Sequence, residues 1–294
     1  MLWIPITLTA TVFQVARNAA QRSLVGGAGP WGATLVRFLF GLPFSMLFTA
    51  IAVTLTPTMT FHLTPVFWMW CVVGGAAQIG ATAALLLAMH RSSFAIGTAF
   101  QQSGLPFAAL MGLAFFHDHI TPLAWVGIAL ATGALMVLSW PKHIDGARDW
   151  SAAALGTLSG AAFALCANAF RQAGLALDPL HPIPSAVATV MVVQAIQSIG
   201  LTSWLAATSR HSLMAALKSW RVSLGAGFFG AAASSGWFSA LALAPAALVR
   251  AVGVVEMPIA AIAGRRLFKE KLSLSQWLWG AAAAAGVVLT ALAR

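Results

Sequence analysis

The sequence predicts an all-α membrane protein with ten transmembrane helices, arranged as two inverted repeats of five helices each. Three observations lead to this prediction. Only 7% of the 294 residues are charged and 60% are hydrophobic, whereas roughly 25% of the residues in a soluble domain are charged. The chain also divides into apolar stretches of about 20 residues, the length that crosses a bilayer. Finally, the second half of the chain repeats the first.

Ten apolar stretches are long enough to form transmembrane helices, and most connections between them are short. In order, they cover residues 2–20, 31–55, 66–89, 93–116, 122–140, 150–172, 183–206, 221–243, 246–264 and 274–292. Tryptophan supports these boundaries, because eleven of the twelve lie near predicted helix ends, where indole rings favour the membrane interface. Trp237 is the exception, well inside a predicted helix.

Short matches in the same order relate the two halves of the chain. At offsets of 150 and 152 residues, the pairs include Thr7 with Thr157, Phe13 with Phe163, Asn18 with Asn168, Pro106 with Pro258 and Trp125 with Trp277. A unit of five helices is odd, so the second copy crosses the membrane in the opposite direction. Inverted repeats of this kind are typical of secondary transporters. We therefore predict two repeats, residues 1–145 and 146–294.

The ends of the two repeats are also alike. In each, a proline-containing helix runs into a short loop with an acidic residue, FFHDHIT or LFKEKLS, and a Gly-rich helix follows, WVGIALATGAL or WLWGAAAAAGVVL. This order resembles the EamA-type members of the drug/metabolite transporter superfamily over nearly the whole chain. The resemblance implies a central cavity between the halves and transport of small organic solutes. Asp118 stands where that family usually has Glu, so we assign its loop only a structural role.

Polar side chains inside the apolar stretches indicate the solute site, because an ionisable group there must face protein or water. The substrate-binding residues that we predict are Gln14, Asn18, Arg37, Gln78, Gln101, Gln102, Asn168, Trp237, Arg250 and Glu256. Gln14, Arg17, Asn18 and Gln21 follow one helical stripe. Hydrogen bonding between helices is the alternative for this stripe, and Arg17 lies near a predicted helix end, where it could reach the interface.

Glu256 is the only acidic residue within a predicted helix. It could carry a proton or bind an amine, or it could form a structural ion pair with Arg37 or Arg250. We expect helix kinks at Pro106 and Pro258, close to the polar residues Gln101, Gln102 and Glu256.

Two further hypotheses concern amides and an aromatic ring. Asn18 and Asn168 are repeat mates that could hydrogen-bond each other or a ligand. Trp237 could hold a cation by a cation–π contact, or it could face lipid.

The basic residues give an orientation. When Arg17, Arg37 and Arg250 are left out, eleven Lys and Arg lie on one side of the membrane and two on the side of both termini. The positive-inside rule therefore places the termini outside the cytoplasm, whereas proteins of the resembled family usually have both inside. We expect a multi-pass protein of a bacterial inner membrane, as a monomer or homodimer.

The combined prediction is a secondary transporter that exports an amino acid or a related zwitterion by alternating access, with the solute and membrane lipid as its partners. The alternatives are an exporter of amines or cationic drugs, a passive channel and a lipid scramblase. An intramembrane enzyme is not expected, because the sequence offers no clustered carboxylates and no nucleophile with a nearby base. We expect no metal, nucleic acid or cofactor, although Glu256 would suit proton coupling.

Overall fold

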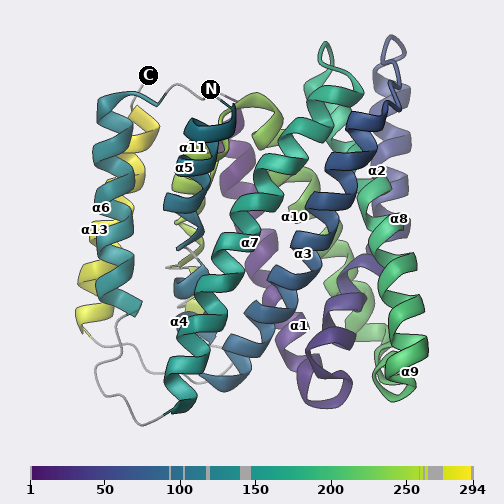
Figure 1. Cartoon of the computed structure of the whole chain (residues 1–294), viewed down its shortest axis with the longest axis horizontal. Helices are drawn as coiled ribbons and strands as arrows, with labels where there is room; N and C mark the ends of the chain where they lie inside the picture. Colours follow the sequence, from purple (N-terminus) through teal and green to yellow (C-terminus); the bar gives the residue numbers. More distant parts are fainter. Residues whose placement is uncertain are drawn as a thin grey trace.

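The structure, a computed structural model, describes residues 2–92, 94–101, 103–116, 120–139, 147–257, 259–260, 262–263 and 274–292. Every regular element within these residues is an α-helix, which confirms the predicted class. The long helices run side by side in alternating directions, and the two ends of the chain lie on the same side of the molecule (Figure 1).

The helices follow one another with short connections. In the first half they are α1 Trp3–Leu39, α2 Leu42–Leu55, α3 Pro65–Arg91, α4 Phe94–Gln101, α5 Gly104–Phe116 and α6 Pro122–Ser139. In the second half they are α7 Ala147–Leu177, α8 Pro182–Thr208, α9 Arg210–Lys218, α10 Trp220–Leu243, α11 Ala246–Gly253 and α13 Leu274–Leu292. The short helix α9 lies in a segment that we had expected to be a connection.

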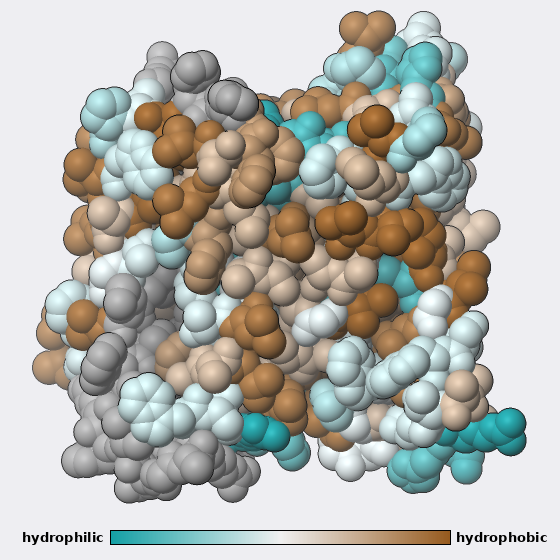
Figure 2. Space-filling model, viewed as in Figure 1, coloured by the Kyte–Doolittle hydropathy of each residue, from teal (hydrophilic) through white to brown (hydrophobic). Residues whose placement is uncertain are grey.

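The described helices are those of a membrane-embedded protein. Five helical segments are long and apolar enough to cross a membrane, namely Trp3–Leu55, Pro65–Arg91, Trp150–Leu177, Pro182–Thr208 and Trp220–Leu243. Large apolar side chains such as Phe115 and Ile199 are exposed on the helix surfaces. Figure 2 shows hydrophobic side chains across the middle of one face, with the most hydrophilic ones mostly toward its upper and lower edges. Such extensive apolar surface is typical of contact with lipid.

The first two predicted stretches are joined more tightly than we expected. The helix continues past residue 20 and changes direction at Gly29, whose φ of 70° suits glycine. Pro30 begins the second arm, where its missing N–H is tolerated. The Gln21 side chain bridges the two arms by donating to the backbone carbonyl of Ala33 at 2.7 Å.

Three of the predicted helices are interrupted. The stretch 31–55 breaks at Phe40–Gly41, ahead of Pro43. At this break the backbone lies so close to α10 that a Cβ on Gly227 would overlap Phe40. The stretch 93–116 breaks at Ser103, between α4 and α5. Pro106 therefore lies in the first turn of α5, where its missing N–H removes no helical bond.

The third interruption follows α11, at the turn Val254–Val255 just before Glu256. Pro258, the second expected kink, lies outside the described residues, as do the acidic-loop residues Asp118 and Glu270.

Long-range packing pairs helices from the two halves of the chain. The most extensive contacts join α1 to α10, α3 to α7 and α6 to α13, and α2 packs on α8. Small residues permit the closest of these approaches, because a Cβ on Gly286 of α13 would lie only 2.7 Å from the carbonyl oxygen of Gly127 in α6. One apolar core joins α1, α3, α7, α8 and α10, and a second joins α5, α6, α11 and α13.

Candidate functional site

A small cavity lies among α1, α3, α7, α10 and α11. Its lining residues are Gln14, Arg17, Arg37, Gln78, Phe163, Cys166, Ala167, Phe170, Ser234, Trp237, Phe238, Leu241 and Arg250. Both halves of the chain contribute to this list, and five of the predicted site residues, Gln14, Arg37, Gln78, Trp237 and Arg250, are on it.

Glu256 is anchored by two amides of α1. Gln14 Nε2 donates to its Oε2 at 2.5 Å, and Asn18 Nδ2 donates to its Oε1 at 3.1 Å. The carboxylate is fully buried, and it does not itself line the cavity. The predicted polar stripe of α1 thus holds the carboxylate of the second half, which directly follows the turn at Val254–Val255.

Arg17 belongs to the same network, although the sequence suggested that it could reach the membrane interface. Its Nε and Nη2 atoms donate to Asn18 Oδ1 at 3.1 and 2.6 Å. The side chain is 1% exposed and lines the cavity. Sequence reasoning placed Arg17 at a helix end because it ended the first helix at residue 20; the continuation to Gly29 puts Arg17 in the helix interior.

Arg37, on the second arm of α1, is fixed by two hydroxyl groups. Its Nη1 donates to Thr82 Oγ1 of α3 at 2.9 Å, and its Nη2 donates to Ser234 Oγ of α10 at 3.3 Å. The Nε atom is buried without a hydrogen-bond partner. Neither hydroxyl neutralises the charge, and Arg17 is close enough to repel it.

Arg250 of α11 lies over the ring of Trp237, with its Cζ 5.6 Å from the ring centroid. The guanidinium is 5% exposed, and its Nε and Nη2 atoms have no hydrogen-bond partner. Gly253 permits this arrangement, because a Cβ at that position would overlap the Trp237 indole. The predicted cation–π role of Trp237 is therefore occupied by a side chain of the protein itself.

The rest of the lining includes amide and aromatic side chains. Gln78 accepts a hydrogen bond at 2.9 Å from Nε2 of Gln197 in α8. Phe170 and Phe238 stack with their centroids 4.1 Å apart. The cavity lining therefore combines aromatic rings with arginines and glutamines.

Two predicted residues lie elsewhere. Asn168 donates to the Ala164 carbonyl of its own helix at 3.0 Å and does not meet its repeat mate Asn18. Gln101, at the end of α4, is fully buried with neither amide atom hydrogen-bonded, but it does not line the cavity. Gln102 lies outside the described residues.

The charge of the site is strongly positive. Three arginines line the cavity, and no acidic residue is among its described lining residues. Glu256 lies near enough to attract Arg17 and Arg250, so within the described residues one negative charge accompanies the three positive charges of the lining. A surplus of buried positive charge is unfavourable in a medium of low polarity unless a further anion joins it.

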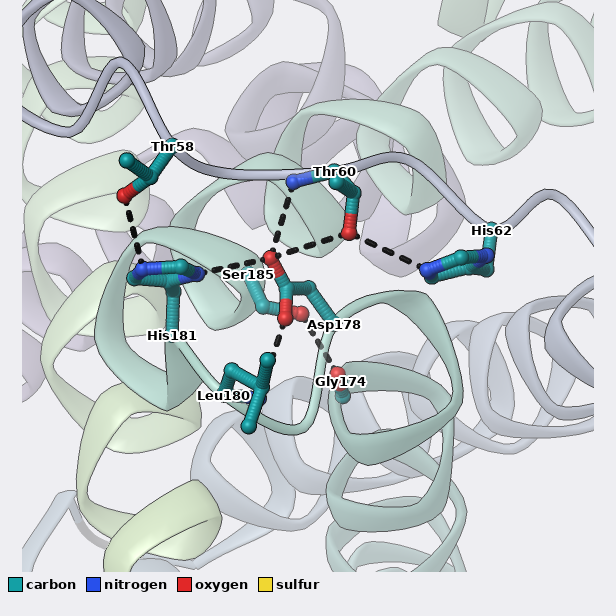
Figure 3. A network of polar contacts seen from close by, with 8 residues as sticks. All are labelled: Thr58, Thr60, His62, Gly174, Asp178, Leu180, His181 and Ser185. Carbon is teal, nitrogen blue, oxygen red and sulfur yellow. Dashed lines mark hydrogen bonds and ion pairs between the residues drawn. The ribbon is translucent and has the colours of Figure 1, made fainter.

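A second polar cluster, which sequence reasoning missed, joins the α2–α3 loop to the α7–α8 turn (Figure 3). We call Thr58, Thr60, Asp178 and His181 the loop clasp. Asp178 Oδ2 accepts from the Thr60 N–H at 2.9 Å and lies 2.9 Å from His181 Nδ1. His181 Nε2 in turn lies 3.0 Å from Thr58 Oγ1. The Thr60 N–H, with His181 and the Leu180 N–H, lowers the pKa of Asp178 to about 2, against the opposing effect of its burial.

Over the residues that the structure describes, no three His, Cys, Asp or Glu side chains gather as a metal site would require. The two cysteines are free, and Cys166 lines the cavity.

Comparison with known proteins is informative for the fold alone. No family model and no curated protein matches the sequence. Among solved structures, 26 chains match. One, called "Crystal structure of protein", aligns over 100% of this chain and 97% of that chain, with a TM-score of 0.68 and 15% identity. At this identity, the match shows a shared fold.

Proposed function

We propose that this protein is a secondary transporter of a small metabolite in a bacterial inner membrane. The observation behind the proposal is the buried, charged cavity, lined from both halves of the chain. Ionisable groups within a membrane are unfavourable, and where they occur they commonly mark a path for a solute or an ion. Arg17, Arg37 and Arg250 are each at most 5% exposed and together line this one space.

The packing of the helices supports two inverted five-helix repeats and ten transmembrane helices. The offset of about 150 residues relates α1 to α7 and α3 to α10. If each helix is replaced by its repeat mate, the α1–α10 pair becomes the α7–α3 pair. These two pairs have the most extensive contacts among the described helices. The pairs α2–α8 and α6–α13 each join an element to its own repeat mate. This is the arrangement expected about a pseudo-two-fold axis.

Interrupted helices, one of which (α11) contributes Arg250 to the cavity lining, support alternating access. Breaks occur at corresponding places in the two repeats, at Ser103 and at Val254–Val255. Discontinuous helices are common at the solute sites of transporters, since they can hinge and expose polar backbone groups. Rocking of one half against the other would open the cavity to each side in turn, in keeping with the resemblance to EamA-type transporters.

Counterflow in proteoliposomes tests the proposal. Vesicles with purified protein are preloaded with one unlabelled solute, and uptake of the same radiolabelled solute is followed for a panel of alanine, glutamate, phenylacetate and putrescine. A carrier gives saturable uptake that the internal solute accelerates. The control is vesicles that contain the Arg250→Gln variant, in which uptake should fall.

Two outcomes contradict a carrier. Uptake that rises linearly with concentration and ignores the internal solute indicates a channel. Exchange of labelled lipid between leaflets, without any solute uptake, indicates a scramblase.

A further inference from the structure

We infer that the cavity binds a small organic acid, whose carboxylate lies between Arg250 and Arg37 and whose apolar body rests on the aromatic wall. The inference deepens the proposed transport function and rests on it for the use of the site. An organic acid differs from the amino acid or zwitterion that the residue types alone led us to expect as the solute.

The first support is the set of unused donors. Arg250 has two buried nitrogens, Nε and Nη2, without partners, and Arg37 has one, Nε. Both side chains line the cavity. A buried donor without an acceptor is costly. A guanidinium matches a carboxylate with two parallel hydrogen bonds, so a carboxylate in the cavity satisfies Arg250 in a way that no described side chain does.

The second support is the balance of charge. Arg17, Arg37 and Arg250 face the cavity, and among the residues that the structure describes Glu256 is the acidic residue whose charge opposes them. A solute with one or two acidic groups brings the site close to neutrality. A cation would add a fourth positive charge to the space, and like charges in a medium of low polarity repel strongly.

The third support is the state of Glu256, the carboxylate nearest the arginines in the part of the chain that the structure describes. Both of its oxygens already accept amide hydrogen bonds, from Gln14 and from Asn18. It is fully buried and lies outside the cavity lining. An amine or a zwitterion would have to displace Gln14 to reach it.

The apolar wall selects the rest of the solute. Trp237 lies under Arg250, and the stacked pair Phe170 and Phe238 faces the same space. Aromatic side chains pack well against rings and aliphatic groups. A carboxylate with an apolar body therefore complements both the arginines and the aromatic rings of the cavity lining.

A matched series of ring compounds tests this inference. Phenylacetate, phenylalanine and phenethylamine share one ring and carry a carboxylate, both groups, or an amine alone. Succinate provides two carboxylates without a ring. Each is added at millimolar concentration to the purified protein, and the melting temperature is recorded. We expect phenylacetate to raise it most, succinate less, and phenethylamine not at all.

Variants locate the acid. Arg250→Gln should weaken phenylacetate binding by about tenfold or more, because a charge-assisted pair is lost. Arg250→Lys keeps the charge without the two-pronged geometry and should bind with intermediate affinity. The control is Arg210→Gln, at the exposed start of α9, which should leave binding unchanged.

The series on the native chain is decisive even if a variant fails to fold. Stabilisation by phenethylamine, equal stabilisation by phenylalanine and phenylacetate, or no shift with either acid would each overturn the acid site. The counterflow assay distinguishes failure of the acid-site inference from failure of the transport proposal. An acid that binds without being carried contradicts transport alone, and counterflow of alanine or putrescine without any acid binding contradicts the acid site alone.

Discussion

Glu256 illustrates how a single residue connects the two halves of the chain. Its carboxylate accepts from Gln14 and Asn18 of α1, and its charge attracts Arg17 and Arg250. The sequence allowed Glu256 to carry a proton, bind an amine or form a structural ion pair, and its contacts resemble the structural role most. These two hydrogen bonds, however, come from amides of α1 and not from an arginine. Glu256 offsets part of the arginine charge.

Neutralising Glu256 should destabilise the protein. In Glu256→Gln, three buried arginines lose their nearby counter-charge, and one of the two donating amides meets an NH₂ group instead of an oxygen. We expect the free energy of unfolding to fall by about 3 kcal/mol, as for a buried ion pair deprived of one partner. Thermal unfolding in detergent measures the change.

The double variant Glu256→Gln/Arg250→Gln is the matched control, because it removes one charge of each sign. It should recover part of the lost stability. If Glu256→Gln melts at the native temperature, the balance of charge is not what Glu256 provides.

At the scale of elements, helix breaks and loop contacts position the site. The turn at Val254–Val255 separates Arg250 from Glu256, so the two side chains no longer follow the angular spacing of one continuous helix. The change of direction at Gly29 brings Arg37 back to the level of Arg17 and Gln14. The loop clasp then ties the α2–α3 loop to the α7–α8 turn (Figure 3).

The loop clasp should make stability depend on acidity. The pKa of Asp178 is lowered from 3.8 to about 2, first by the Thr60 N–H. A carboxyl group whose pKa is lower in the folded state contributes stability that is fully present above the unfolded pKa. That contribution is lost as the pH falls from about 4 toward 2.

Asp178→Asn should therefore lower the melting temperature at neutral pH by a few degrees, with the difference from the native chain shrinking below pH 4. Thermal unfolding at several pH values measures this. Thr208→Ala, whose exposed hydroxyl bonds only to the backbone of its own helix, is a control without this pH dependence. A difference that stays constant with pH would show that the ionised carboxylate does not stabilise the clasp.

At the scale of the whole molecule, the positions of the basic residues predict its orientation. The short helix α9, with Arg210 and Lys218, lies on the side away from both chain ends (Figure 1). The loop clasp lies on the side of the chain ends. The positive-inside rule therefore places α9 in the cytoplasm and the clasp and both termini outside.

Cysteine labelling in intact cells tests this orientation, in a chain whose native Cys71 and Cys166 are replaced by serine. A membrane-impermeant maleimide should label Leu180→Cys, at a position 83% exposed beside the clasp, without any permeabilisation. Arg210→Cys should react only after the membrane is opened. The reverse pattern would place the termini in the cytoplasm, as in proteins that the sequence resembles.

The helical class and most helix positions could be predicted from the sequence, because these depend on local composition. A bilayer demands long apolar segments, so α3, α6, α7, α8, α10 and α13 could be located within a few residues. The sequence also identified Gln14, Arg37, Gln78, Trp237 and Arg250, which line the cavity, since polar groups stand out against an apolar background.

Only the tertiary structure decided what those groups do. Rotation about each helix axis, the continuation of α1 to Gly29 and the breaks in the helices set which side chains meet, and all of these follow from packing between distant segments. Arg17 moved from a presumed helix end into the cavity, while Asn168 turned to its own helix. The partners of Glu256 lie 242 and 238 residues away along the chain. No local pattern encodes such contacts, because they form only when the two halves pack against each other.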